Sequence, residues 1–227
     1  RVYERVDVFI APSEYLRGVM VEAGVAEERI VFVPPLNPAS ARETDATHTR
    51  PALSLPPRFV AYVGRLSREK GVHVLLAAMA RTKDIPLVVF GDGPAAPALR
   101  LAARQLGIDV VFAGHSSRET LEAALGRTAA VVMPSLSPEN APMAVLEAAD
   151  AGVPVIVSDR GGLPELARRV GGMVVPAGDD RALARSITAL WNDNQRARER
   201  GRAAWLASGA IHGADAHVAA VEAIYHR

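Results

Sequence analysis

Cysteine is absent from the 227 residues of this chain, and its absence excludes several kinds of protein. Without thiols the chain forms no disulfide, binds no metal through sulfur and has no cysteine nucleophile. Long apolar runs are also missing, since none approaches the ~20 residues of a membrane-spanning helix, and no signal peptide is evident. We therefore expect a cytoplasmic protein, whose only membrane contact would be peripheral, at the inner face and through a domain outside this sequence.

An excess of charge of either sign is lacking as well, because 26 basic residues balance 25 acidic ones and leave a net charge of +1. That charge provides no general field for recruiting nucleic acid, and we expect no nucleic-acid partner. No Asp-x-Asp sequence occurs and the histidines are scattered, so we expect no metal site. The hydrophobic content of 49% is enough for one good core, or for one core and part of a second.

Strand-like and helix-like segments alternate from Arg58 onward. Strands are expected at 59–63, 86–90, 110–113, 129–133, 154–158 and 172–175, and helices at 72–80, 96–106, 118–125, 142–151, 163–169 and 214–225, with a long helix from 181. Six strands joined by helices indicate an α/β fold with a doubly wound, parallel, Rossmann-like sheet. Ligands of such sheets bind at the carboxyl ends of the strands.

Residues 1–44 contain a second, smaller strand–helix–strand pattern. A strand ending at Ala11 precedes a helix at 14–22 that Ser13 can cap, and another strand follows at 30–33. Residues 38–57 are rich in proline and small polar residues, which is typical of a linker or surface loop. The sequence opens at Arg1 rather than at a methionine, so we expect a fragment of a longer chain.

The most informative stretch runs from 131 to 165, where the sequence predicts a strand, a loop and a helix that begins at Pro142. The first backbone amides of that helix lack partners within it, and donors at the positive end of a helix dipole form an anion site. These amides belong to Met143, Ala144 and Val145. Glu147 follows one turn later with its side chain inclined toward the helix start, and Glu139 lies in the preceding loop. This arrangement can hold a phosphate, a ribose diol and a sugar ring, although two solvated glutamates are the simpler alternative.

The loop at 64–71, Gly-Arg-Leu-Ser-Arg-Glu-Lys-Gly, follows the strand at 59–63. Gly64 permits a close backbone turn, and Arg65 and Lys70 can direct two positive charges toward the carboxyl end of the sheet. Fixed cations there stabilise the negative charge that develops on a departing nucleoside diphosphate. The alternative is a solvated basic loop. Lysine occurs only at positions 70 and 83, so its presence at 70 favours a specific role.

Two glycine-rich turns are interpreted differently. Residues 91–96 fit the G-x-G-x-x-G/A pattern of dinucleotide-binding proteins, but the next strand lacks the acidic residue that would bind a ribose, so we do not expect NAD binding. Residues 158–165 are interpreted as a turn followed by a capped helix start, in which Glu165 has a structural role.

A series of short sequences follows in a fixed order: Pro134-Ser135, Glu139, Glu147-Ala148, Ala-Gly-Val-Pro-Val-Ile-Val-Ser-Asp at 151–159 and Gly-Gly-Leu-Pro-Glu at 161–165. This order resembles the sugar-donor motif of retaining GT-B glycosyltransferases of family 4, or glycosyl transferases group 1. The loop at 64–71 matches that family's G-R-x4-K-G signature. The resemblance spans nearly the whole chain and implies the C-terminal half of a GT-B fold. Residues 1–44 would then end the N-terminal acceptor domain and enter the linker, 45–210 would bind the nucleotide sugar, and 211–227 would return toward the N-terminal domain.

The resemblance also implies roles for individual residues. Arg65 and Lys70 would bind the donor diphosphate, and Glu139 would hold the sugar hydroxyls. These three residues would form the catalytic group. The remaining donor contacts would come from Asn140, Ala141, Met143, Ala144, Glu147, His115 and Ser116. Among these, Met143 and Ala144 would bind phosphate through their amides, Glu147 would hold the ribose diol, and His115 and Ser116 would meet the base. Pro142 stands where the family often has a glycine, which leaves the sugar's identity open.

The expected activity is hexosyl transfer from a nucleoside diphosphate sugar, with retention of configuration and without a cofactor. UDP is favoured over GDP or ADP as the nucleotide, and the acceptor is unknown. The fragment alone should be inactive, because its N-terminal domain is missing, and the exposed inter-domain surface would favour self-association. Two alternatives remain: a non-catalytic domain that binds nucleotide sugars or a protein partner, and a GT-B epimerase that acts on a nucleotide sugar.

Overall fold

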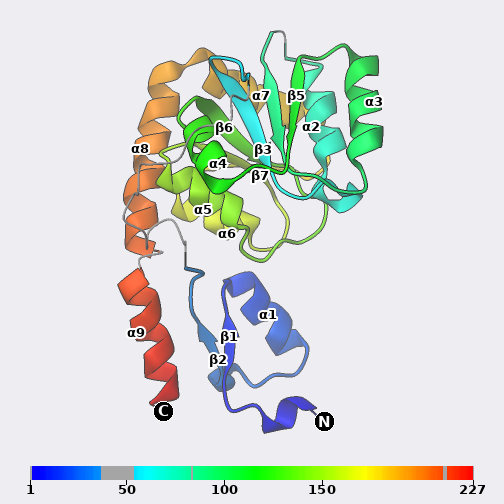
Figure 1. The fold of residues 1–227 in the computed structure, drawn as a ribbon. Helices are drawn as coiled ribbons and strands as arrows, with labels where there is room; N and C mark the ends of the chain where they lie inside the picture. The colour runs from blue at the N-terminus through cyan, green and yellow to red at the C-terminus, as the bar shows by residue number, and fades with distance from the viewer. Residues whose placement is uncertain (1, 37–53, 83, 212–213, 227) are drawn as a thin grey trace.

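The computed structural model describes residues 2–36, 54–82, 84–211 and 214–226, and these contain two separate parallel sheets (Figure 1). The smaller sheet pairs β1 (Phe9–Ala11) with β2 (Ile30–Phe32). Helix α1 (Glu14–Glu22) connects these strands, with short 3-10 turns at Val2–Arg5 and Glu27–Arg29. Ser13 caps α1 as expected, because its Oγ accepts a hydrogen bond from the Leu16 amide at 3.1 Å.

The larger sheet has six strands in the order β5-β4-β3-β6-β7-β8, and every neighbouring pair is parallel. The strands are β3 (Phe59–Val63), β4 (Leu87–Phe90), β5 (Val110–Gly114), β6 (Thr128–Met133), β7 (Val155–Ser158) and β8 (Met173–Val175). The chain proceeds outward from β3 to β5 and then returns to β6 on the other side of β3. The order therefore reverses between β3 and β6, where a doubly wound sheet opens a crevice at its carboxyl edge.

Helices cover both faces of this sheet, and each face has its own hydrophobic core. One face packs against α2 (Val72–Met79), α3 (Ala96–Leu106) and α7 (Asp180–Asn192). The other packs against α4 (Arg118–Leu125), α5 (Met143–Asp150), α6 (Leu163–Arg169) and α8 (Asn194–Ile211). Helix α9 (Ala214–Tyr225) lies beside the smaller sheet in Figure 1. The predicted α/β, doubly wound fold is confirmed.

Two predicted helix boundaries were wrong. The long helix expected from 181 is two helices, because Asp193 ends α7 and its carboxylate accepts a hydrogen bond from the Arg196 amide at 2.9 Å, which caps α8. Pro142 is the N-cap of α5 rather than its first helical residue, since its ψ of 126° is extended. The expected linker lies largely outside the described residues, and the division into domains stays a prediction.

Candidate active site

The loop that follows β3 is fixed against the loop that follows β6. Gly71 has a φ of 69°, and a Cβ placed on it would lie 2.0 Å from the carbonyl oxygen of Pro134. Only glycine permits that approach. The amide of Leu136 donates a hydrogen bond to the carbonyl of Glu69 at 2.8 Å, which joins the same two loops. A short 3-10 turn at Arg68–Lys70 then directs Lys70 toward the β6 loop.

Lys70 and Glu139 form an ion pair between these two loops. The distance from Lys70 Nζ to Glu139 Oε1 is 2.6 Å, and the side chains are 26% and 15% exposed, respectively. The hydroxyl of Ser135 donates to the same carboxylate oxygen at 2.6 Å. Two donors therefore orient the Glu139 carboxylate through Oε1. The sequence placed both residues at the carboxyl edge of the sheet but did not predict their direct contact.

Arg65 belongs to the same loop as Lys70. The hydroxyl of Tyr62 donates to the Arg65 carbonyl at 2.8 Å and so fixes the backbone at this point. Burial raises the pKa of the Tyr62 hydroxyl, with smaller contributions from Glu139 and Glu69, so it remains a protonated donor. The Arg65 side chain is exposed and forms no hydrogen bond or ion pair with the described residues. Its guanidinium group is therefore available to a ligand.

The amino end of α5 has two backbone amides that are not hydrogen-bonded to any described residue. They belong to Met143 and Ala144. The amide of Val145 was also expected to be free, and this was wrong, because it donates to the carbonyl of Pro142 at 3.1 Å in a tight first turn. An anion at this helix end would thus meet two free amides and the positive end of the helix dipole.

Glu147 is half-buried on α5. Burial raises the pKa of its carboxyl group, an effect that Arg118 opposes and that Glu122 and Asp150 reinforce. Arg118 and Glu122 both belong to α4, and both affect the pKa of Glu147. The Glu147 carboxylate therefore lies within electrostatic reach of the first turns of α4.

His115 and Ser116 lie between the end of β5 and the helix α4, at the same edge of the sheet as Glu147. His115 is exposed and Ser116 is partly exposed. Along this edge, His115 and Ser116 follow β5, Lys70 follows β3, and Glu139, the start of α5 and Glu147 follow β6, which pairs with β3.

The structure also reveals contacts that the sequence analysis missed. Ser135 is fully buried, and its carbonyl accepts a hydrogen bond from the Ser158 hydroxyl at 2.6 Å. The hydroxyl of Ser13, far away in the sequence, donates to Oδ1 of Asn140. The sequence identified Pro134-Ser135 only as part of a motif. The hydrogen bond from the Ser135 hydroxyl to Glu139 was not predicted, because it depends on tertiary structure.

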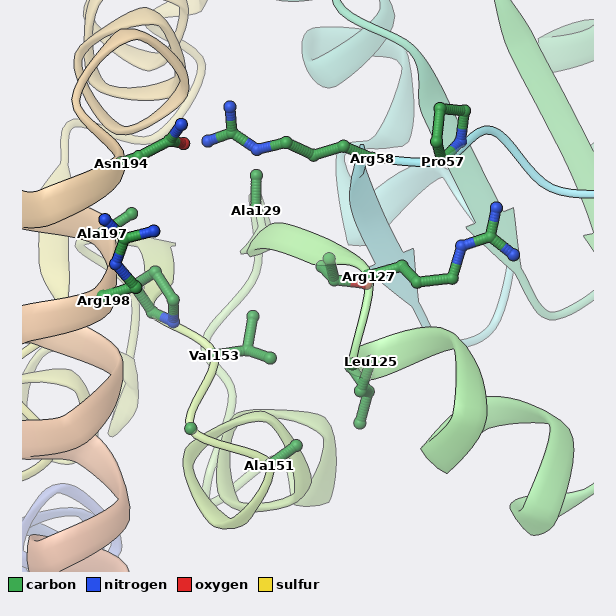
Figure 2. Close-up of a pocket in the computed structure, with 14 residues that line it drawn as sticks. Pro57, Arg58, Leu125, Arg127, Ala129, Ala151, Val153, Asn194, Ala197 and Arg198 are labelled. Carbon is green, nitrogen blue, oxygen red and sulfur yellow. The ribbon is translucent and has the colours of Figure 1, made fainter.

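A hollow of about 450 Å³ lies at the opposite, amino edge of the sheet (Figure 2). Three arginines line it: Arg58, Arg127 and Arg198. Arg58 donates to the carbonyls of Trp191 at 2.9 Å and Leu190 at 3.3 Å. Arg127 donates to the carbonyls of Leu55 at 2.7 Å and Pro56 at 2.5 Å. Two of the three guanidinium groups thus hold chain segments together, and they point to opposite sides in Figure 2. The candidate site is therefore at the carboxyl edge.

Within the described residues, no group of three or more histidine, aspartate or glutamate side chains could hold a metal ion. In the same part of the chain, none of the helices combines the length and the apolar character needed to cross a bilayer. Metal independence and cytoplasmic location stay predictions.

Comparison with known proteins gives consistent matches. Residues 44–205 match the sequence model of the family described as "Glycosyl transferases group 1". The D-rhamnosyltransferase WbpZ of Pseudomonas aeruginosa is 37% identical over 152 residues, which are 65% of this chain and 40% of that protein. This chain therefore aligns with about two fifths of that relative's length.

Solved structures show the same fold. The Anabaena protein HepE, in complex with UDP and glucose, superposes with a TM-score of 0.85 at 21% identity, over 97% of this chain and 64% of that one. Sucrose-phosphate synthase from Thermosynechococcus elongatus superposes with a TM-score of 0.78 at 26% identity, over 96% of this chain and 57% of that one.

Proposed function

The chain belongs to the glycosyl transferases group 1 family, and from this premise we propose that it is the donor-binding part of a retaining, family 4 glycosyltransferase of GT-B fold. The observation that carries the proposal is the contact between Lys70 and Glu139 beside the free amides at the start of α5. A cation, a carboxylate and two backbone donors are the groups needed to bind a diphosphate and a sugar next to one another.

The diphosphate of the donor would lie between the amino end of α5 and the loop that carries Arg65 and Lys70. The amides of Met143 and Ala144 would each donate to a phosphate oxygen, and the free guanidinium of Arg65 would pair with it. Lys70 has three donors and uses one on Glu139, so it can contact phosphate without breaking its ion pair. These cations replace the divalent metal that many nucleotide-sugar sites require.

The sugar would lie over Glu139. Oε1 of Glu139 is already bonded to Lys70 and Ser135, so Oε2 remains available to a sugar hydroxyl. Backbone groups of Asn140 and Ala141 adjoin it. As the bond from the anomeric carbon to the diphosphate oxygen breaks, its electron pair passes to the diphosphate, where Arg65 and Lys70 stabilise the charge. Hexosyl transfer with retention is inferred from the family resemblance.

The nucleoside would occupy the other end of the same edge. Glu147 would accept hydrogen bonds from the ribose diol, and His115 and Ser116 would adjoin the base. UDP is the favoured nucleotide, which is supported by the UDP-bound structure of the similar HepE. The acceptor and its contacts would come from an N-terminal domain, of which residues 1–44 are the final part. The chain alone should bind nucleotide without turning over.

The test is calorimetry of the chain with UDP, GDP and ADP, repeated with Lys70→Ala and Glu147→Ala. Both substitutions should weaken UDP binding by about tenfold or more, equivalent to about 1.4 kcal/mol. Arg68→Ala is the matched control, because it removes a positive charge from an exposed side chain in the same loop and leaves the Lys70–Glu139 pair intact. Unchanged affinity in both test variants would contradict the site assignment.

The reaction itself is tested in a complete chain that includes the N-terminal domain. Sugar transfer that is lost in Glu139→Ala supports the glycosyltransferase. Nucleotide binding without any transfer would instead favour a non-catalytic binding domain, and an epimerised but untransferred sugar would favour an epimerase.

A further inference from the structure

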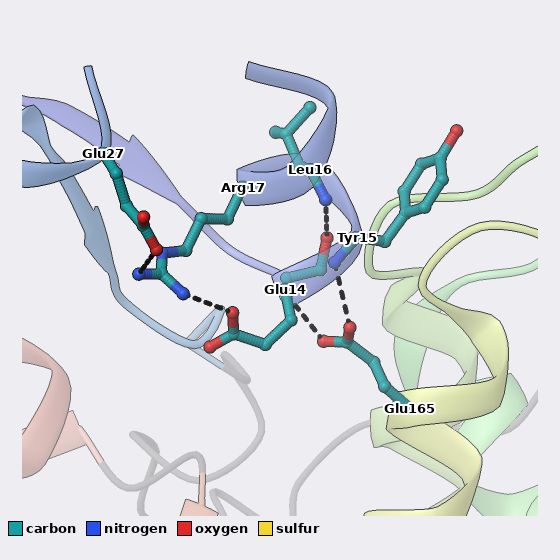
Figure 3. A network of polar contacts seen from close by, with 7 residues as sticks. Glu14, Tyr15, Leu16, Arg17, Glu27 and Glu165 are labelled. Carbon is teal, nitrogen blue, oxygen red and sulfur yellow. Dashed lines mark hydrogen bonds and ion pairs between the residues drawn. The ribbon is translucent and has the colours of Figure 1, made fainter. Parts of the chain in front are cut away.

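The carboxylate of Glu165 caps a helix that lies 150 positions earlier in the chain. Its two oxygens accept hydrogen bonds from the amides of Glu14 and Tyr15, each at 3.1 Å (Figure 3). These are the first two residues of α1, so Glu165 satisfies two of the amides that a helix leaves unpaired, and its charge lies at the positive end of the dipole. The expectation that Glu165 has a structural role is confirmed, but its partner is α1 rather than its own helix α6.

The same helix start contacts the loop of the candidate active site. Ser13, the N-cap of α1, uses one hydroxyl for two bonds: it accepts from the Leu16 amide at 3.1 Å and donates to Oδ1 of Asn140. Asn140 directly follows Glu139. The position of α1 therefore determines where the Ser13 hydroxyl meets this loop.

A third contact joins the loop to α6, which carries Glu165. Gly162 is the N-cap of α6, and its amide donates to the carbonyl of Glu139 at 2.7 Å. A Cβ placed on Gly162 would lie 2.1 Å from the carbonyl oxygen of Asn140 and 3.2 Å from Cβ of Ser13. Three segments remote in sequence, 13–15, 139–140 and 162–165, thus contact one another in pairs. We call this set of contacts the α1 clamp.

The residues of α1 do not form a buried hydrophobic contact of their own. None of the residues of α1 is buried, so its apolar side chains contribute little to holding it on the larger domain. Outside the clamp, the guanidinium group of Arg169 in α6 lies over the ring of Phe32 in β2, 4.8 Å from its centroid. The start of α1 itself meets the loop and α6 through the polar contacts of the clamp.

We propose that Glu165 is a positioning residue, which fixes the loop of Glu139 and Asn140 by holding the start of α1 against it. The sugar end of the donor site is then completed by the segment before residue 36, whereas the nucleotide end depends on the larger domain alone. The ordering of the loop stands on the contacts themselves, and only its effect on sugar binding rests on the proposed function.

Hydrogen exchange of the ligand-free chain tests the ordering directly. Glu165→Ala should speed exchange at the amides of Glu14 and Tyr15 and, through the clamp, at Asn140 and Ala141, by about fivefold or more. Glu165→Gln keeps one acceptor oxygen in place and should restore part of the protection. It also provides a folded variant if the alanine variant unfolds.

The matched control is Glu14→Ala. Its side chain pairs with Arg17 at 3.2 Å, but its backbone amide is the group that Glu165 accepts from, so the clamp remains (Figure 3). This variant should leave exchange at Asn140 and Ala141 unchanged. Faster exchange in Glu165→Ala at α1 alone would reduce Glu165 to a local helix cap and overturn the proposal.

Binding provides the second test, with UDP-glucose and UDP as probes. Glu165→Ala should weaken the affinity for UDP-glucose by about threefold or more and change the affinity for UDP by less than about twofold. The affinity of Glu165→Gln for UDP-glucose should lie between those of Glu165→Ala and the unaltered chain. An equal loss for both ligands would contradict a role confined to the sugar end. If the unaltered chain binds neither ligand, the proposed function fails, while the exchange result still decides whether the clamp orders the loop.

Discussion

Replacing Lys70 by alanine should have two separable effects, because its ammonium group contacts Glu139 and is expected to contact the diphosphate. The variant loses a cation from the site and leaves the Glu139 carboxylate with Ser135 as its remaining hydrogen-bond donor. That unpaired negative charge would then repel a bound diphosphate. Glu139→Gln removes the repulsion, so the double variant Lys70→Ala/Glu139→Gln should bind UDP more tightly than Lys70→Ala alone.

The structure sets the size of both effects. A hydrogen bond to a charged group contributes about 1.5–3 kcal/mol, so Lys70→Ala should weaken UDP binding about 10- to 150-fold. Breaking an exposed ion pair costs ~1 kcal/mol or less, and breaking a buried one costs ~3–5 kcal/mol. With side chains 26% and 15% exposed, the Lys70–Glu139 pair lies between these cases, and we expect a loss of about 1–3 kcal/mol in the free energy of unfolding.

Calorimetry with UDP and urea unfolding measure the two quantities on the same four proteins: the unaltered chain, both single variants and the double variant. The expected result is coupling, in which Glu139→Gln recovers part of the stability and affinity lost in Lys70→Ala. Strictly additive effects would show that the contact is not energetically significant. Wild-type UDP affinity in Lys70→Ala would refute the assignment of Lys70 to the diphosphate.

Four further predictions concern Glu147, Gly71 and Asp193. Because burial raises the pKa of Glu147, UDP affinity should decline on acidification at a pH above the ordinary glutamate value of about 4.3, and a pH-independent affinity in this range would count against a ribose contact. The same shift means that ionisation of Glu147 disfavours the folded state, so stability should fall as pH rises between the unfolded and folded pKa values, and Glu147→Gln should remove that dependence. Gly71→Ala should lower the free energy of unfolding by about 1–3 kcal/mol or more, measured with urea, because alanine at φ 69° is strained and its Cβ overlaps the carbonyl of Pro134. An unchanged free energy of unfolding would show that the loop is adaptable. Asp193→Ala should lower the free energy of unfolding by about 1 kcal/mol, because it removes the cap of α8, whereas Asp193→Asn should leave this free energy nearly unchanged.

Self-association is expected from the exposed apolar side chains of the smaller sheet, its helix and the preceding 3-10 turn, which include Tyr3, Ile10, Tyr15, Val19 and Val21. Analytical ultracentrifugation should show a species larger than the monomer that grows with protein concentration. A monomer at every concentration would contradict this prediction.

The elements of the fold could be predicted from the sequence because each one has a local signal. The helices α1, α3, α4, α6 and α9 begin and end at the predicted residues, and the six strands of the larger sheet lie within one or two residues of prediction. These strands are short apolar runs, and all except β7, which is followed by Asp159, end at proline or glycine, so their limits are largely determined by the chain itself. The break at Asp193 was missed, since aspartate is only weakly unfavourable within a helix and the cap that it forms depends on the turn.

The site was predictable as a set of loops at one edge of the sheet, because parallel strands bring their carboxyl ends together. Its internal contacts were not predictable. The pairing of Lys70 with Glu139 joins residues 69 positions apart, and the contacts of Ser13 and Glu165 join segments 127 and about 150 positions apart. Such contacts depend on how two loops or two sheets are placed, and no local pattern in the sequence records that placement. The free amide expected at Val145 was wrong for a different, local reason, since this amide bonds to the Pro142 carbonyl three residues earlier in a tight first turn.

A crystal structure of the chain with UDP bound would locate the diphosphate directly. We expect the two phosphates to lie between the amides of Met143 and Ala144 and the side chains of Arg65 and Lys70, with the ribose against Glu147. A nucleotide bound at the arginine-lined hollow at the amino edge, or with its phosphates away from α5, would contradict this expectation.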